Sequence, residues 1–360
     1  MKRFLKYGLL AVVIGAGLGV AAQADDVATG GGITVRSADG NFEASLGGRI
    51  HFDGAILAPD NGSALGISGK SNDSGFFFRR VYITLKGKAY GFEYHVDEDV
   101  NDSNSPGDGL KNVWLAHRLF GGKIYIGQHK PWRSIDELAS NNDTPFLERD
   151  ALSANGLFGG RDYTQGLYYD RAKRSLLRNG DRLWLGGSFY TNAKAGQKAP
   201  GPSRAYGANA RLVYAPILTS SAWLHLGASY SFDHFAADGR GFGLTSGYST
   251  WYAKHGEKAN LLSLSAAGVT RNASTTTLEL MGALGPVFVA TELGDEHAYG
   301  GAQSATVQAF SVNAAYALTG ETRTYKKGDA TYGGIKPRHS YGAVELAARY
   351  DYVRNKDVAS

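Results

Sequence analysis

The sequence predicts an all-β protein that crosses a membrane as an antiparallel β-barrel, and three observations predict it. Apolar and polar residues alternate with period two in many segments of about ten residues, as in barrel strands. The connections between these segments alternate between short and long, which is typical of outer-membrane barrels. The 360 residues include 49 Gly, 21 Tyr and 16 Phe but no Cys, which suits packed strands with aromatic girdles and excludes a disulfide framework.

The first residues have the organisation of a secretory signal peptide. Lys2, Arg3 and Lys6 form a cationic start, residues 9–22 are apolar and small, and Ala22-Gln-Ala24 is a cleavage site of the A-x-A type. We therefore expect residues 1–24 to be removed and residues 25–360 to form the barrel. A single transmembrane helix is the alternative interpretation of the apolar run.

Removal of the signal peptide makes the protein nearly neutral. The basic residues fall from 38 to 35 against 33 acidic residues, so the formal net charge falls from +5 to about +2. A nucleic-acid-binding protein needs a basic stripe, so nucleic acid is not an expected partner. After residue 24 no apolar run reaches the roughly 18 to 20 residues that a membrane helix requires.

Residues 42–54 show the alternation most clearly. Leu46 and Ile50 fall on one face of this segment, while Arg49 and His51 fall on the other. Twelve further strands are predicted at 76–86, 91–100, 111–119, 123–130, 162–171, 182–191, 205–215, 223–233, 276–284, 287–297, 305–318 and 344–352.

The alternating faces predict what each strand contacts. Backbone groups inside lipid must all be paired, which an open sheet cannot achieve, so the strands are expected to close into a barrel. The apolar faces then meet lipid, and Arg49, Arg80, Glu345 and Arg349 are predicted to point into a water-filled lumen. A secreted β-sandwich is the alternative fold, in which the charged faces would simply be solvated.

The strand count is odd, whereas bacterial single-chain barrels have even numbers of strands. We therefore expect three further strands beyond residue 360, where the chain reaches a polar segment after a predicted strand. The alternative is an unrecognised strand within 234–275, where Leu261 to Val269 is ambiguous.

The segment "GQHKPWRSIDELASNNDTPFLER" at 127–149 is too charged to continue the strand before it, and it resembles the third loop of the phosphate-selective porins O and P. Similar segments are "NFEASLGGRI" at 41–50, "FFFRRVYITLKGKAYG" at 76–91 and "LTGETRTYKKGDATYGGIKP" at 318–337. The resemblance extends in order from about residue 33 to 352. It implies a trimeric, 16-stranded anion channel of the bacterial outer membrane that passes phosphate or another oxyanion.

The resemblance also implies which side chains line the anion pathway. Arg79 has the opposite parity to Arg80, so it needs a β-bulge or a position at the rim. The connection 131–161 is expected to fold into the lumen and narrow it. Guanidinium groups suit such a pathway because their paired N–H donors match oxyanions and stay charged. The expected pathway residues are Arg49, Arg79, Arg80, Lys130, Arg133, Arg149 and Arg349.

Two departures from the family pattern leave the solute open. Glu137 stands where the phosphate binders of the family carry a constriction lysine, and residues 243–260 contain no arginine. A weakly selective general porin is therefore an alternative within this class. A non-conducting barrel that acts as a surface receptor or adhesin is the alternative outside it.

Two basic regions, 170–182 and 321–338, are predicted at the periplasmic end from the parity of the connections. We expect them to form an electropositive exit for anions, with ordinary solvated turn residues as the alternative. The residues of this predicted periplasmic cluster are Arg171, Arg174, Arg323, Lys326 and Lys327.

Other site chemistry is not supported by the spacing of the polar residues. The nine His include no pair at i, i+4 on a predicted helix, and Asp97 to Asp108 lacks the glycine and glutamate of a calcium loop. We therefore expect no enzymatic activity, metal or cofactor. The expected partners are small anions, the lipid and lipopolysaccharide of the outer membrane, and further copies of the chain in a homotrimer.

Overall fold

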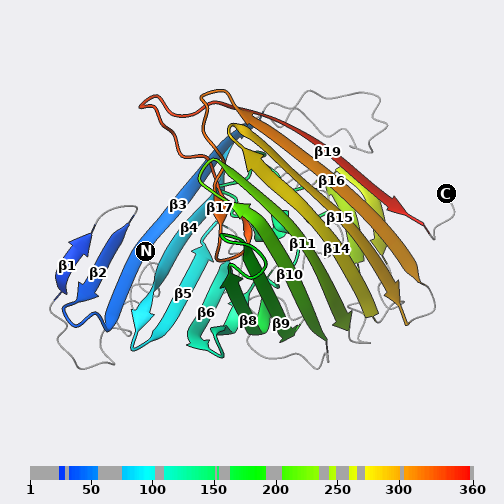
Figure 1. Ribbon diagram of the computed structural model, residues 1–360. Coiled ribbons are helices and arrows are strands. Elements are labelled where there is room, and N and C mark those ends of the chain that lie inside the picture. The colour runs from blue at the N-terminus through cyan, green and yellow to red at the C-terminus, as the bar shows by residue number, and fades with distance from the viewer. Residues whose placement is uncertain are drawn as a thin grey trace.

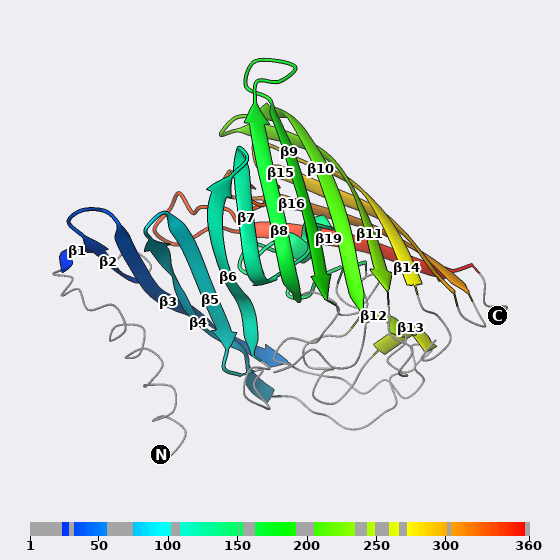
Figure 2. The same cartoon turned by 90° about the horizontal axis from the view of Figure 1, so that it is seen from below.

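The computed structural model describes residues 24–28, 32–55, 75–101, 109–150, 152–153, 163–191, 205–234, 243–248, 259–265, 272–300 and 304–356. In these residues one 15-stranded antiparallel sheet runs in chain order from β1 to β19. The sheet curls around β17 and the chain next to it (Figures 1 and 2). The predicted all-β antiparallel fold is confirmed, and within the described ranges β1 and β19 form the two edges of the sheet.

The strands of the sheet have the following bounds: β1 (Ala24–Ala28), β2 (Ile33–Ser37), β3 (Phe42–Ala55), β4 (Gly75–Ala89), β5 (Phe92–Asp99), β6 (Leu110–Leu119), β7 (Gly122–His129), β8 (Thr164–Arg174), β9 (Arg182–Thr191), β10 (Tyr206–Leu218), β11 (Ala222–His234), β14 (Asn272–Leu284), β15 (Val287–Tyr299), β16 (Ala305–Ala317) and β19 (Glu345–Asn355). Outside the sheet lie α2 (Ile135–Leu138) and two hairpins, β12 (Gly243–Tyr248) with β13 (Ala259–Ser265) and β17 (Tyr325–Lys326) with β18 (Thr331–Tyr332).

Each of the thirteen predicted strands coincides with a strand of the sheet, from β3 to β11, from β14 to β16, and β19. The strands β1 and β2 were not predicted, and β2 meets β3 only through Ile33–Arg36. Within the ambiguous region 234–275, β12 and β13 pair with each other and not with the described part of the sheet.

Tight turns lie together at one end of the sheet, which we call the short-turn end. Tyr90 and Gly91 have φ of 49° and 85°, and Phe120 and Gly121 have φ of 54° and 73°. Positive φ at both central residues gives the turn whose twist matches that of the flanking strands. The connection 130–163 leaves from the opposite end, as predicted, whereas the connection 318–344 between β16 and β19 leaves from the short-turn end.

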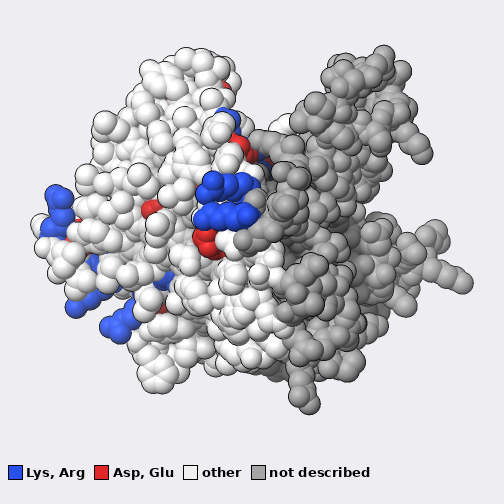
Figure 3. Space-filling view, turned by 90° about the vertical axis from the view of Figure 1, so that its right-hand side faces the viewer, with Lys and Arg blue, Asp and Glu red and all other residues white. Residues whose placement is uncertain are grey.

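The two faces of the sheet are the reverse of those in a soluble protein. On β14, Leu278 and Leu280 are 53% and 47% exposed, whereas Thr277 and Glu279 are buried. Figure 3 shows broad surface areas without charged side chains. An apolar exterior and a polar interior are what lipid-embedded strands require. Among the described residues, no helix is long and apolar enough to cross a bilayer.

Two connections pack against the polar inner face and form the core with it. We call them the long loop (residues 130–153) and the C-terminal loop (residues 318–344). Trp132 of the long loop packs edge-on against Trp184 of β9, with ring centroids 5.4 Å apart. Tyr332 of the C-terminal loop packs against Phe288 of β15 at 5.2 Å. The apolar core therefore lies between the wall of the sheet and these loops.

Candidate functional site

The long loop is bound to the wall at its helix. Ser134 Oγ and the Ile135 N–H both donate to Glu292 Oε2, at 2.9 and 3.0 Å. The Trp132 carbonyl accepts a hydrogen bond from the Asn209 side chain. Glu292 and Asn209 are buried on the face opposite the exposed leucines. The loop therefore lies against the polar face of β10 and β15.

Arg133 is an anchor of the long loop, which differs from its predicted place in the anion pathway. Its side chain is 0% exposed, and its Nη1 lies 3.7 Å from Asp233 Oδ2 and 3.3 Å from the Tyr190 hydroxyl. A solute cannot reach a guanidinium in this position. The sequence showed a cation in a polar loop, but not the carboxylate of β11 that faces it.

The arginine pair of β4 enters the inner face through a β-bulge. His51 and Phe52 of β3 are opposite Arg80 and Phe78, so Arg79 is the extra residue between two partnered positions. A bulge rotates the side chain that follows it, which removes the parity conflict between the two arginines. Of the two explanations expected for Arg79, a β-bulge or a position at the rim, the structure has the bulge.

Arg79 and Arg349 hold the end of the long loop. Arg79 is buried, with Nε 2.5 Å from Asp53 Oδ2 and Nη2 2.5 Å from Glu148 Oε1. Arg349 Nη1 donates to the Glu148 carbonyl at 2.7 Å, and its Nε lies 3.0 Å from Asp351. Both arginines face inward, but their charge is neutralised by carboxylates.

A cavity of about 250 Å³ lies between the long loop, the wall and the C-terminal loop. Arg49 reaches it with its guanidinium 4.0 Å from the centre of the Tyr82 ring and its Nη1 3.5 Å from Ser140 Oγ. Arg149 donates from Nη2 to the Ala139 carbonyl at 2.8 Å. The lining residues that bear charge are Arg49, Arg149, Lys130, Lys326, Asp97 and Asp329.

The cations of this cavity differ in their partners. Lys130 forms an ion pair with Glu137 at 3.0 Å, and Lys326 forms one with Asp143. Arg149, by contrast, donates to neutral oxygens, the Ala139 carbonyl and the Asn141 amide. The positive charge of the cavity is therefore carried more by the arginines than by the lysines.

The predicted periplasmic cluster is divided by the structure. Arg323 is 3% exposed and binds Glu345 through two hydrogen bonds of 2.6 and 2.7 Å, so it is not part of an open exit. Arg171 is opposite Leu185, which is exposed on the outer face, so it points away from the interior. Arg174 is opposite Arg182, and Arg182 donates to the Lys327 carbonyl at 2.9 Å.

Four inward cations near the short-turn end were not singled out from the sequence. Lys86 and Lys88 share the parity of inward Thr84, which donates to Asp97. Arg118 and Lys123 are opposite each other across β6 and β7. Period-two parity from Thr84 and Trp114 was the signal that could have identified them. Carboxylates of the same face lie among them at Glu43, Glu93 and Asp170.

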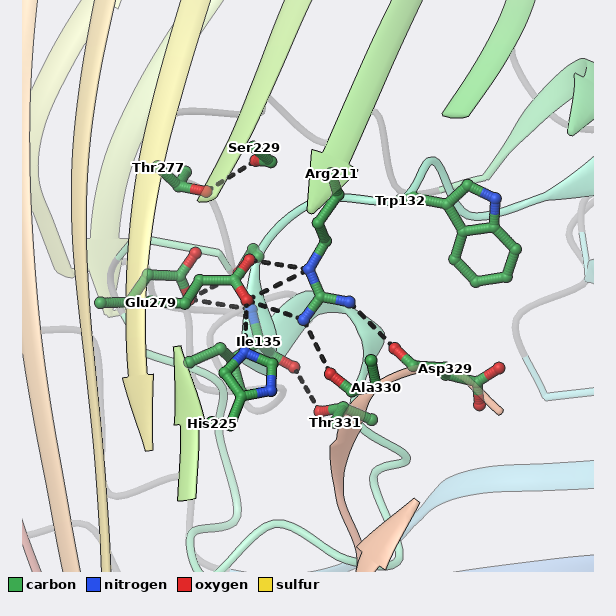
Figure 4. Close-up of polar contacts among 12 residues, drawn as sticks. Trp132, Ile135, Arg211, His225, Ser229, Thr277, Glu279, Asp329, Ala330 and Thr331 are labelled. Atoms are coloured by element: carbon green, nitrogen blue, oxygen red, sulfur yellow. Dashed lines mark hydrogen bonds and ion pairs between the residues drawn. The ribbon is translucent and has the colours of Figure 1, made fainter. Parts of the chain in front are cut away.

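The C-terminal loop is held by a buried network around Arg211 of β10 (Figure 4). Arg211 Nη2 lies 2.7 Å from Glu279 Oε2, and its Nη1 and Nη2 donate to the Asp329 and Ala330 carbonyls at 2.9 and 2.8 Å. His225 Nε2 lies 2.9 Å from the same Glu279 oxygen. This network fixes the loop in the middle of the inner face.

Two carboxylates meet inside the long loop. Ser153 Oγ lies 2.7 Å from Asp150 Oδ1 and 3.2 Å from Asp136 Oδ2, and the Tyr332 hydroxyl donates to Asp136 Oδ1 at 2.6 Å. Burial, reinforced by the charge of Asp136, raises the pKa of Asp150 to about 7. The loop thus contains a group that titrates near neutral pH. In the described part of the chain no cluster of His, Asp and Glu is placed to hold a metal ion.

Comparisons with known proteins match most of the chain to one family. The model of the family described as phosphate-selective porin O and P matches residues 45–359. Porin O of Pseudomonas aeruginosa is 26% identical over 92% of this chain and 77% of its own length. An uncharacterized protein of Caulobacter vibrioides is 25% identical over 89% of this chain and 63% of its own length. Among solved structures, outer-membrane expressed OmpT of Vibrio cholerae is 12% identical with a TM-score of 0.44, over 87% of this chain and 98% of that chain.

Proposed function

This chain belongs to the phosphate-selective porin O and P family of the bacterial outer membrane, and from this premise we propose that it forms a water-filled channel for the passive diffusion of small anions. Phosphate or another oxyanion is the first candidate solute. Residues 1–24 would be removed as a signal peptide, residues from 25 onward would belong to the barrel, and the protein would assemble as a homotrimer, as the family resemblance implies.

The observation that carries this proposal is the cavity between the loops and the wall. Arg49 and Arg149 come from distant parts of the chain and line the same space of about 250 Å³. Rings of Arg and Lys are the usual device of anion pores. The long loop would narrow the channel here, since polar backbone is tolerated at membrane depth where it meets protein and water.

The inward cations of the short-turn end would extend the anion pathway from the cavity toward the periplasm. Lys86, Lys88, Arg118 and Lys123 share the inner face of neighbouring strands. An anion that leaves the cavity would meet this face before it reaches the periplasm. The carboxylates among these cations would keep binding weak, as release requires. Arg79, Arg133 and Arg349 would act by holding the long loop in place.

A weakly selective pore is the second candidate, and a specific observation favours it. Both cavity lysines are paired with carboxylates, Lys130 with Glu137 and Lys326 with Asp143. A neutralised cation attracts a passing anion less than an unpaired one. Selectivity for anions over cations would then be moderate.

Planar-bilayer recording of the purified full-length protein tests the proposal. In a KCl gradient we expect a reversal potential of the sign that chloride permeation gives, together with a lower chloride current when inorganic phosphate is added. A reversal potential near zero, with no effect of phosphate, would assign the weakly selective pore. No conductance at all would favour the receptor or adhesin and contradict the proposal.

A further inference from the structure

The outer face of β19 changes character along its length. Leu346 and Tyr350 are each 61% exposed, Tyr352 follows on the same face, and Arg354 and the exposed Lys356 complete the series. The apolar residue lies toward the short-turn end and the cations toward the opposite end. Apolar, aromatic and cationic residues in this order match a path from the hydrocarbon to the headgroups of a bilayer.

Arg354 is part of a polar row across three neighbouring strands. Its Nε and Nη2 donate to Gln308 Oε1 of β16 at 3.1 and 2.7 Å. Gln308 Nε2 in turn donates to Asp295 Oδ2 of β15 at 2.7 Å. The row thus contains one carboxylate, but the direct partner of the guanidinium is a neutral amide. In the described ranges neither Arg354 nor Lys356 forms an ion pair with a carboxylate.

An apolar groove of about 390 Å³ lies beside this row on the same outer face. Its apolar walls come from four strands that neighbour one another in the sheet: Leu278 of β14, Leu293 of β15, Phe310 of β16 and Tyr352 of β19. Asp295, Gln308 and Arg354 close it at one end. The groove is therefore apolar along its walls and has the guanidinium of Arg354 at one end.

The free-energy cost of a cation on the lipid face indicates where the polar row lies in the membrane. A cation on the lipid face costs about 2–4 kcal/mol at the midplane but about 0–1 kcal/mol near the interface. Asp295 lies in the second half of β15, which starts at the tight turn Gly285–Pro286. The row is thus near the end opposite the short turns, which is the extracellular end in outer-membrane barrels.

We propose that this surface binds an anionic lipid of the outer leaflet. The guanidinium of Arg354 and the ammonium of Lys356 bind the phosphate of the headgroup, and one acyl chain lies in the groove formed by Leu278, Leu293, Phe310 and Tyr352. An anionic lipid matches both parts of this surface, because its phosphate is an oxyanion that the cations can bind and its acyl chain is a hydrocarbon that fits the apolar walls. The site depends on the outer-membrane location and not on conduction.

Native mass spectrometry of the delipidated, folded protein with added lipid A tests the site. We expect the double variant Arg354→Ser with Lys356→Ser to bind lipid A about thirtyfold more weakly, since each cation contributes about 1 kcal/mol near a charged surface and 1.4 kcal/mol is a factor of ten. The matched control is Arg171→Ser, which removes an outward cation at the short-turn end and should keep the native affinity.

Two further measurements show whether the headgroup charge and the attached acyl chain are both needed for binding. A zwitterionic lipid with the same acyl chains should bind the native protein more weakly than lipid A, and inorganic phosphate at the same concentration should not displace lipid A. Native affinity for lipid A in the folded double variant would overturn the proposal. An altered oligomeric state with unchanged lipid binding would also overturn it and assign the surface to a second copy of the chain.

Discussion

The long loop and the C-terminal loop occupy the same inner face, but the helix of the long loop is bound by the opposite chemistry from the C-terminal loop. Around this helix the loop supplies donors, and the wall supplies the carboxylates of Glu292 and Asp233. At Trp132 and Glu148, by contrast, the wall donates to the long loop. The C-terminal loop supplies backbone carbonyls, and the wall supplies the donors: Arg211 binds Ala330, Trp184 Nε1 binds Gly328, and Trp223 Nε1 binds the Arg323 carbonyl.

Some of these partners lie at opposite ends of the wall, although Glu292 is directly opposite Glu279, the partner of Arg211. The wall donors Arg182, Trp184 and Trp223 lie where β9 and β11 begin, at the short-turn end, from which the C-terminal loop enters. The carboxylate of Asp233 lies near the other end of β11, from which the long loop enters. We call these two ends of the inner face the two zones of the wall: each supplies a partner to the loop that enters there, Trp223 to the C-terminal loop and Asp233 to the long loop.

The loops also bind each other where the zones meet. Asp143 of the long loop binds Lys326 and accepts from the Gly334 N–H at 2.9 Å. Thr331 Oγ1 donates to the Ile135 carbonyl at 3.1 Å. If the two zones are independent, a change in one should release one loop and leave the other docked.

Replacement of Arg211 should have the largest effect. Arg211→Ala leaves the buried Glu279 carboxylate without its arginine, though still bonded to His225, and two carbonyls of the C-terminal loop without donors, so we expect a loss of about 3–5 kcal/mol in stability. Thermal unfolding followed by circular dichroism measures it. Arg211→Met with Glu279→Leu should recover part of the loss, because no unpaired charge remains. Equal unfolding temperatures for Arg211→Ala and the native protein would contradict the role given to this network.

Replacement of Glu292 should release the long loop and spare the C-terminal loop. Glu292→Ala leaves the Ser134 hydroxyl and the Ile135 N–H without an acceptor, at a cost of about 1–3 kcal/mol. We expect single-channel conductance to rise, since a displaced loop no longer narrows the channel. Glu292→Gln is the matched control, because its amide oxygen can still accept both bonds. Identical conductance in the Ala and Gln variants would contradict this anchor.

The stability of the long loop should depend on pH through Asp150. Its pKa is raised from an ordinary value near 3.8 to about 7, so the folded protein holds this proton in a window where the unfolded chain has lost it. The contribution of the group is complete below about pH 4, falls as pH rises to about 7 and is constant above it. The difference in unfolding temperature between the native protein and Asp150→Asn should change in that window. A constant difference from pH 4 to 8 would show that the pKa is ordinary.

The junction between the loops should contribute least to stability. The Lys326 side chain is 41% exposed, so its ion pair with Asp143 should contribute only about 0–1 kcal/mol. Lys326→Ala should therefore leave the unfolding temperature nearly unchanged while slightly lowering the preference for anions, since one cavity cation is lost. A large fall in unfolding temperature would mean that the loops depend on each other and not on separate zones.

Sequence periodicity was enough to predict thirteen of the fifteen strands of the sheet and their faces, because these depend on local alternation, and one parity conflict pointed to a bulge or a rim position at Arg79. It could not predict the partners of the loops. Arg133 and Arg323 were interpreted as accessible cations, but their carboxylates, Asp233 and Glu345, lie 100 and 22 residues away along the chain. Parity shows which face a side chain occupies and not what packs against it. Short hairpins such as β17–β18 could not be predicted from periodicity, because tertiary contacts and not alternation stabilise them.

The reversal potential of Arg49→Gln with Arg149→Gln in a KCl gradient shows whether the cavity selects anions. These two arginines line the cavity between the zones, and the amide variants keep much of the side-chain length while removing the charge. We predict a clear shift toward cation permeation, whereas Arg171→Gln on the outer face should keep the native value. The same reversal potential in the double variant and the native protein would contradict the claim that this cavity selects anions.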